Sequence, residues 1–398
     1  MKLLHTADWH LGKYLEGWSR IEEQEAFIEE LIDIVEENEV DMILITGDIF
    51  DTTNPSAEAE SLFFYALDKL SKEGERIICL ISGNHDSPKR LIAPVPLSKR
   101  QGIFVMDHSH HLEELTKHDY LLDCGSGYIE FNIKGENVVL LALPYPSESR
   151  LNQIISEITD ERVMQEDYSK NVGKIFSELE SHYSDDTINI AMSHLFVAGG
   201  QSSKSERPIH IGGSMTVFTD HLPEKSQYTA LGHLHRYQIA SAAKKAYYSG
   251  SPIQYSVSEK DHKKSVSLVE LHPGEEAKIQ ELELKNKKPI EVWEVESIDE
   301  AIDLIESNKE RPVWAYLYIH IQKTLLQSEI KKIKELKPDI LSIIPVSEDH
   351  EAEESYNEQA EDLDIMDLFK EYYLKVNNVE LDKEVLEMFA NIVNERGL

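Results

Sequence analysis

Val40-Asp41-Met42-Ile43-Leu44-Ile45 leads directly into Thr46-Gly47-Asp48-Ile49-Phe50-Asp51, and this stretch decides the fold. A short apolar run that ends at a glycine indicates a β-strand buried on both faces, followed by a loop. Open α/β sheets place their functional residues at the carboxyl ends of such strands, so Asp48 is a candidate site residue. An aspartate after a glycine is also ordinary turn chemistry, and Asp48 alone therefore decides nothing.

The same pattern recurs at four other places in the chain. Each is a short apolar run that ends in Asp, Asn or His, usually beside a glycine. These runs lead into Asp8 and His10, into Asn84 and His85, into His194, and into His233 and His235. A single histidine in such a place is usually an ordinary core or surface residue. Five strand ends together favour one shared site, and their mixture of carboxylate, amide and imidazole groups suits a divalent ion such as Mn²⁺, with Fe or Zn as variants.

Size and composition indicate a soluble globular protein. The chain has 398 residues, of which 41% are hydrophobic and 29% charged, and this length suggests about two or three domains. No apolar run approaches the roughly 20 residues that span a bilayer, and no secretory signal is visible at the start. Cys79, in a predicted core strand, and Cys124, in a predicted turn, do not make a disulfide framework. We expect a cytoplasmic protein that is not bound to a membrane.

The formal net charge of −34 counts against simple binding of nucleic acid. Duplex binding usually needs a basic surface. The charge does not exclude such a substrate, because bound divalent cations reverse the local field and another subunit could supply the basic surface.

Five motifs, taken in chain order, resemble those of the calcineurin-like metallophosphoesterases: Asp8-x-His10, Gly47-Asp48-x-x-Asp51, Gly83-Asn84-His85-Asp86, the single His194, and Gly232-His233-x-His235. The fuller motifs, residues 5–12, 47–51 and 82–88, are most similar to those of the bacterial double-strand-break nuclease subunits in that family. The resemblance covers all five motifs, and the length of the remaining chain also fits.

The resemblance implies two divalent metal ions, Mn²⁺ with Mg²⁺ as the alternative. Asp48 would bridge them. Asp8, His10 and His235 would complete the first site, and Asn84, His194 and His233 the second. His85 would hold no metal and would protonate the leaving alkoxide as a general acid, for which an imidazole of ordinary pKa about 6.5 is suited. Asp86 could orient His85 or cap its loop, and Asp51 could support the ligands.

For residues 1–278 we expect an α/β fold in four layers, α/β/β/α, with two mixed sheets between helices. Helical spacing predicts helices at 20–38, 56–73 and 157–184, and a hairpin at 128–133 and 138–145. Strands at 246–250 and 264–272 could complete the second sheet. The second helix is apolar on more than one face, which indicates either full burial or, with residues 91–97, a homodimer interface. Residues 108–111 are expected in a plain solvated loop, and 198–208 in a connection or a gating loop.

Turn and charge signals place a domain edge near 273–289. Residues 279–346 are expected to form a small α+β module, which in the family would be a cap that helps to orient DNA. Residues 347–362 have the composition of an acidic linker. Residues 363–398 would form two amphipathic helices, which in the related nucleases bind the coiled-coil base of an SMC-like ATPase.

The resemblance therefore implies a Mn²⁺-dependent DNA nuclease acting with an ATPase in a heterotetramer on nucleoid DNA. Its expected activities are 3′–5′ double-strand exonuclease and single-strand or hairpin endonuclease, used in DNA end processing, repair and recombination. The alternative is a phosphodiesterase or phosphomonoesterase of the same fold acting on small molecules, which would share every ligand. A non-catalytic scaffold of this fold typically lacks some ligands, whereas this chain has the full set.

Overall fold

The computed structural model describes residues 1–93, 101–106, 118–147, 161–206, 215–321 and 325–346, with only the backbone for 161–167. The chain divides into two compact units. The first comprises Met1–Glu291 with Pro312–Trp314, and the second comprises Val292–Arg311 and the chain from Ala315 onward. The expectations for residues 94–97, 108–111, 207–208 and 347–398 lie outside the described residues.

Six strands form the first sheet, in the order β17-β16-β1-β4-β5-β6. Their bounds are β1 Lys2–Thr6, β4 Met42–Thr46, β5 Ile77–Ile81, β6 Ile103–Met106, β16 Ser265–Glu270 and β17 Lys278–Glu283. Strands β1, β4, β5 and β6 run parallel, whereas β16 pairs antiparallel with β1 and β17 pairs antiparallel with β16 at the edge of the sheet. Strand β4 is thus central and is buried along its whole length, as predicted.

Seven strands form the second sheet, in the order β14-β15-β13-β10-β9-β8-β7. Their bounds are β7 Leu121–Gly125, β8 Tyr128–Ile133, β9 Glu136–Leu143, β10 Ile188–His194, β13 Tyr228–Gly232, β14 Gln238–Ser241 and β15 Ala246–Tyr248. The predicted hairpin is the antiparallel pair β8–β9. Two expectations are wrong: β16 joins the first sheet and not the second, and Cys124 lies on strand β7 and not in a turn.

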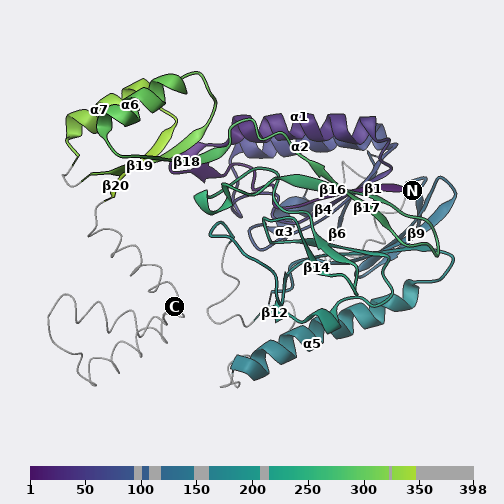
Figure 1. Cartoon of the computed structure of the whole chain (residues 1–398). Coiled ribbons are helices and arrows are strands. Elements are labelled where there is room, and N and C mark those ends of the chain that lie inside the picture. The colour runs from purple at the N-terminus through teal and green to yellow at the C-terminus, as the bar shows by residue number, and fades with distance from the viewer. Residues whose placement is uncertain (94–100, 107–117, 148–160, 207–214, 322–324, 347–398) are drawn as a thin grey trace. The chain divides into compact units, whose positions relative to one another are not determined.

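Helices cover the outer faces of both sheets. Helices α1 (Ile21–Glu37) and α2 (Ala57–Ser71) lie over the first sheet, and α5 (Glu161–Leu179) lies over the second (Figure 1). Alternate residues of β4 face opposite layers: Ile43 packs into the core under α1 and α2, while Met42 and Leu44 pack into the core between the sheets. A third core lies between the second sheet and α5. The four-layer α/β/β/α arrangement is confirmed.

Helix α2 begins where predicted, because the Ser56 side chain accepts a hydrogen bond from the Ala59 N–H at 3.2 Å. Phe63 is buried, but Phe64 and Tyr65 are 45% and 40% exposed. Full burial of this helix is therefore excluded, and it presents an aromatic outer face. Shorter elements of this unit are β2 Tyr14–Leu15, β3 Trp18–Ser19, α3 Pro88–Ile92, β11 Phe196–Val197 and β12 Thr216–Val217.

The first unit extends beyond the domain edge expected after residue 278. Strand β17 begins there and pairs with β16, and the compact unit continues to Glu291. The sequence Lys-Ile-Gln-Glu-Leu-Glu of β17 is largely exposed and charged, so it carries no apolar run that would identify a strand.

The second unit contains the elements of a small α+β module, apart from the first residues of two of its strands. They are β18 Ile290–Val295, α6 Ile298–Ser307, β19 Trp314–His320, α7 Gln327–Leu336 and β20 Ile340–Val346, with the sheet order β18-β19-β20. Ser297 caps α6 by accepting from the Glu300 N–H at 3.2 Å. Ile305 of α6 and Ile333 of α7 are buried. Within the described residues, no helix combines the length and hydropathy that crossing a bilayer requires.

Candidate metal centre

Seven polar side chains converge at the carboxyl ends of strands from both sheets. Asp8 and His10 follow β1, Asp48 follows β4, and Asn84 follows β5 in the first sheet. In the second sheet His194 is the last residue of β10, and His233 and His235 follow β13. Strand β4 packs against both β10 and β13, so the strand ends of the two sheets meet. The structure thus brings together every ligand predicted from the sequence.

These side chains form two clusters with one carboxylate between them. Potential ligand atoms of Asp8, His10 and His235 lie within 4.8 Å of one another, as do those of Asp48, His194 and His233. Asn84 adds its amide oxygen to the second cluster: Asn84 Oδ1 lies 2.9 Å from His194 Nε2 and 3.2 Å from His233 Nδ1.

Asp48 reaches toward both clusters. Its Oδ2 atom lies 3.5 Å from His194 Nε2 in the second cluster and 3.8 Å from His10 Nε2 in the first. Its other oxygen, Oδ1, accepts a hydrogen bond from the backbone N–H of His85 at 2.8 Å. One carboxylate oxygen is therefore fixed by the backbone, while the other faces the imidazoles of both groups.

The His85 ring lies beside the Asp48 carboxylate through Nε2 and contacts the backbone through Nδ1. His85 Nδ1 is 2.7 Å from the Asp51 carbonyl oxygen, and Nε2 is 3.9 Å from Asp48 Oδ2. Potential ligand atoms of His10, Asp51 and His85 also lie within 4.8 Å of one another. Asp51 forms an ion pair with Lys13 at 2.7 Å.

The backbone at the site adopts conformations that side-chain-bearing residues rarely take. The angle φ is 54° at Asp8, 43° at His10, 49° at Asp48 and 108° at His233. Such conformations typically cost about 1–3 kcal/mol each and persist only where the surroundings enforce them. Here the loops after β1 and β4 pair with each other: the Asp8 N–H donates to the Gly47 carbonyl and the His10 N–H to the Asp48 carbonyl, both at 3.0 Å.

Two glycines of the motifs are required by close approach. A Cβ atom on Gly83 would collide with the Asp48 carboxylate, and one on Gly232 would collide with the Thr46 carbonyl. Any side chain at either position would push the strand ends apart. The glycine that accompanies the polar residues in the sequence therefore reports tight packing of loop against loop.

Asp86 ties two loops together and does not orient the His85 ring. Its carboxylate accepts hydrogen bonds from the backbone N–H groups of Gly83, Ile49 and Phe50 at 2.9, 3.2 and 3.0 Å. Of the two roles considered for Asp86, the contacts show the loop cap. Burial, together with the nearby charge of Asp48, raises the pKa of Asp86 to about 6.

Burial keeps three histidines of the site, His10, His194 and His233, neutral. It lowers the pKa of His194 to about 4 and the pKa values of His10 and His233 well below the ordinary value. Burial and the charge of Asp48 raise the pKa of Asp8. A neutral imidazole has one lone pair available for a cation. Because His194 Nδ1 lies 2.8 Å from the Thr46 carbonyl, it carries the proton, and the lone pair is on Nε2, toward Asn84 and Asp48.

The donor set fits divalent ions. Two carboxylates, one amide oxygen and four imidazoles are the mixture expected for ions of intermediate hardness such as Mn²⁺. His10 Nε2 and His235 Nε2 lie only 3.0 Å apart, and His10 Nδ1 is buried with no hydrogen-bond partner among the described residues. A cation bound by His10 Nε2 and His235 Nε2 would give the lone pair of each of these two nitrogens a partner. These residues could therefore hold divalent metal.

Sequence reasoning missed the residues that surround His235. The Ser205 hydroxyl lies 2.6 Å from His235 Nδ1, and Glu206 Oε1 accepts the His235 backbone N–H at 2.9 Å. Glu259, in the short helical turn Val257–Glu259, lies 3.6 Å from Nδ1 and forms a buried ion pair with Lys264. The polar loop at 198–208 was a visible signal for Ser205 and Glu206, whereas no motif marks Glu259.

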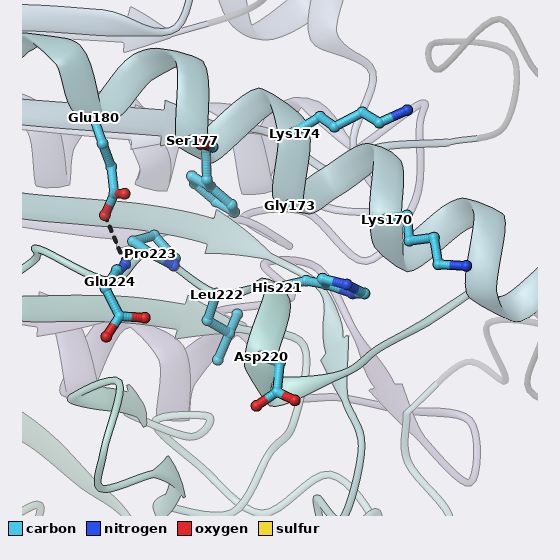
Figure 2. Close-up of a pocket in the computed structure, with 11 residues that line it drawn as sticks. Lys170, Gly173, Lys174, Ser177, Glu180, Asp220, His221, Leu222, Pro223 and Glu224 are labelled. Atoms are coloured by element: carbon cyan, nitrogen blue, oxygen red, sulfur yellow. Dashed lines mark hydrogen bonds between the residues drawn. The ribbon is translucent and has the colours of Figure 1, made fainter.

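A cavity of about 400 Å³ lies elsewhere in the first unit, between α5 and the turn Thr219–His221 (Figure 2). Glu180 crosses one end of it and accepts the Glu224 backbone N–H at 2.6 Å. Lys170 and Lys174 border it from α5. None of the predicted site residues lines this cavity, so it forms no part of the metal centre.

Comparison with known proteins gives consistent matches along the chain. Residues 1–237 match the family model of the calcineurin-like phosphoesterases, and residues 286–377 match the model described as the type 5 capsule protein repressor C-terminal domain. The SbcD subunit of the nuclease SbcCD from Bacillus subtilis (strain 168) is 38% identical over 397 residues, covering 99% of this chain and 98% of that protein. Its counterpart from Rhodobacter capsulatus is 34% identical over 289 residues, covering 69% of this chain and 67% of that protein. A solved dimetal phosphatase from Danio rerio is 12% identical, and the match covers 70% of this chain and 98% of that chain at a TM-score of 0.37.

Proposed function

The chain belongs to the calcineurin-like phosphoesterase family, as a relative of the SbcD subunit of the nuclease SbcCD over nearly its whole length, and from this premise we propose that it is the DNA nuclease subunit of an SbcCD-type complex. Its reaction is metal-dependent hydrolysis of phosphodiester bonds. The observation that carries the proposal is the position of Asp48, whose Oδ2 lies within 3.8 Å of imidazole nitrogens from both clusters.

The seven converging residues would hold two ions, which we assign as Mn²⁺. Asp8, His10 and His235 would serve the first ion, Asn84, His194 and His233 the second, and Asp48 both. Bound ions would activate a water molecule at neutral pH and stabilise negative charge on the phosphate oxygens. The grouping of ligand atoms within 4.8 Å supports this division.

The chain itself would fix the geometry and supply a proton. The His85 backbone N–H and the paired loops after β1 and β4 hold Asp48 in place. With Nδ1 of His85 donating to the Asp51 carbonyl, Nε2 is the ring atom that faces the centre. A protonated Nε2 would pass its proton to the oxygen that leaves phosphorus, which is the role of a general acid.

The substrate proposed is DNA, with 3′–5′ exonuclease activity on duplex ends and endonuclease activity on single strands and hairpins. The support is the nuclease activity named for the two relatives. The net charge of −34 leaves little basic surface for a duplex, which supports a role for a partner that brings one. We propose that this partner is an SbcC-type ATPase, that the complex works on nucleoid DNA in the cytoplasm, and that residues 363–398 bind the ATPase beyond the linker at 347–362.

Two further features fit a heterotetramer with two copies of this chain. The outer face of α2 exposes Phe64 and Tyr65, which supports a homodimer interface at this helix. The α+β unit, expected from sequence at 279–346 and formed by β18 to β20 with α6 and α7, would act as a cap that orients DNA. Its described residues form a small sheet with two helices and include none of the predicted ligands.

The test compares the wild-type chain with Asp48→Ala and the matched control Asp186→Ala. Asp186 is exposed in the turn before β10, at the opposite end of that strand from His194. Each protein is loaded with Mn²⁺ and assayed on a small phosphodiester, then with the ATPase on duplex DNA with and without ATP. We expect Asp48→Ala to lose both activities while the control keeps them. A folded, metal-loaded Asp48→Ala protein that retains more than a few per cent of wild-type activity would refute the assignment.

A further inference from the structure

A closed ring of hydrogen bonds joins the loop at 198–206 to His235. Glu206 Oε1 accepts the His235 backbone N–H at 2.9 Å, and Glu206 Oε2 accepts the Ser203 hydroxyl at 2.8 Å. Ser203 Oγ lies 2.6 Å from Ser205 Oγ, which in turn lies 2.6 Å from His235 Nδ1. The ring thus starts at the backbone of His235 and returns to its side chain.

The direction of the protons around this ring follows from its chemistry. An ionised carboxylate only accepts, and each serine hydroxyl has one proton to give. Ser203 gives its proton to Glu206 and must therefore accept from Ser205. Ser205 has then used its own proton and must accept from His235. The imidazole proton consequently sits on Nδ1, and the lone pair sits on Nε2.

That lone pair is the one the first cluster needs. His235 Nε2 lies 3.0 Å from His10 Nε2 and belongs to the group that includes Asp8. Partners of the second ring nitrogen commonly set which nitrogen of a histidine is free to bind metal. The opposite tautomer would place a proton where a cation has to bind.

The other carboxylate near His235 is less suited to this task. Glu259 Oε1 is 3.6 Å from Nδ1, beyond hydrogen-bond distance, and its charge is paired with Lys264. Lys264 also donates to the His235 carbonyl at 2.9 Å. This pair holds the backbone of His235. Among the described residues, only the Ser205 hydroxyl lies within hydrogen-bond distance of His235 Nδ1.

We propose that Glu206 is a positioning residue: through Ser203 and Ser205 it fixes the Nδ1–H tautomer of His235 and so prepares Nε2 to bind the first metal ion. The inference rests on the proposed two-metal function and deepens it. It also gives the loop at 198–206 a defined role beyond that of a connection. Glu206 would touch neither substrate nor metal.

The first test reads the tautomer in the metal-free, full-length protein by ¹⁵N NMR of the imidazoles, with the His235 signals assigned from their loss in His235→Asn. Wild type should show protonated Nδ1. In Glu206→Gln the amide can donate to Ser203 and reverse the ring, so the signals should shift toward the Nε2–H form or a mixture. An unchanged Nδ1–H tautomer in Glu206→Gln would overturn the inference.

The second test measures Mn²⁺ binding by calorimetry together with the melting temperature of the metal-free protein. Glu206→Gln and Ser205→Ala should weaken one of the two sites by about 10–100-fold, the usual effect of removing a ligand's supporting partner. Ser205→Thr, which keeps a hydroxyl, should restore binding. The control Ser202→Ala alters an exposed serine of the same loop and should match wild type.

The outcomes separate this inference from the function on which it rests. Wild-type protein that binds no Mn²⁺ would defeat both. Two intact sites in Glu206→Gln would defeat the inference alone. Equal weakening of both sites with a lower melting temperature would show a merely structural role and would also overturn it.

Discussion

Replacing His85 with alanine separates proton transfer from metal binding. The ring contributes Nε2, which lies 3.9 Å from Asp48 Oδ2, and Nδ1, which contacts the Asp51 carbonyl. The contact that holds Asp48 comes from the backbone N–H of residue 85, which alanine retains. Both ligand clusters therefore keep all their donors in His85→Ala, and we expect Mn²⁺ content equal to wild type.

Turnover should nevertheless fall. Loss of a positioned general acid slows reactions by about 10²–10⁴-fold, which corresponds to about 3–5 kcal/mol of activation free energy. The loss should depend on the leaving group, because an alkoxide needs a proton and a nitrophenolate does not. We therefore expect the full decrease for a dinucleotide and a much smaller one for a nitrophenyl phosphodiester.

The assay measures kcat for both substrates in parallel with elemental analysis of the dialysed protein. Loss of metal from His85→Ala would show that His85 is a ligand, in keeping with its place beside His10 and Asp51. An equal decrease for both substrates would show that it does not deliver the proton. Either result would refute the reasoning.

Three further predictions concern stability and assembly. Lys264→Met should destabilise the fold by about 3–5 kcal/mol in urea unfolding, because Glu259 keeps a buried charge without its partner; a loss below about 1 kcal/mol would contradict this. Contacts with Glu136 and Glu270 raise the pKa of His272, so its stabilisation is present below about pH 6.5 and is lost as pH rises through the raised pKa. His272→Gln should thus lower the free energy of unfolding, measured in urea, at pH 6 but not at pH 9, by less than about 1 kcal/mol because the pair is exposed; equal effects at both pH values would count against it. Truncation after Ser347 should leave Mn²⁺-dependent cleavage of a small phosphodiester intact and abolish co-elution with the ATPase; co-elution at wild-type affinity would exclude this end as the main tether.

Most of the site was predictable because its signals are local. Each strand end combines an apolar run, a glycine and a polar residue within a few positions, as in Gly47-Asp48 and Gly83-Asn84. The structure explains the glycines, since a Cβ on Gly83 would collide with Asp48. Parallel strands bring their carboxyl ends to one edge of a sheet, so the convergence of these residues followed once the strands were identified.

What the sequence alone determined is therefore the set of candidate ligands that the structure brings together, the central strands and the helices with a clear apolar face. Tertiary structure decided where β16 and β17 pair, because an exposed charged strand such as β17 carries no periodic signal. It also decided the role of Asp86 and the partners of His235. Ser205 and Glu206, from the loop at 198–206, and Glu259, from the helical turn Val257–Glu259, reach that histidine through single hydrogen bonds and charges. Such contacts depend on how the chain folds back on itself, and no local pattern of residues encodes them.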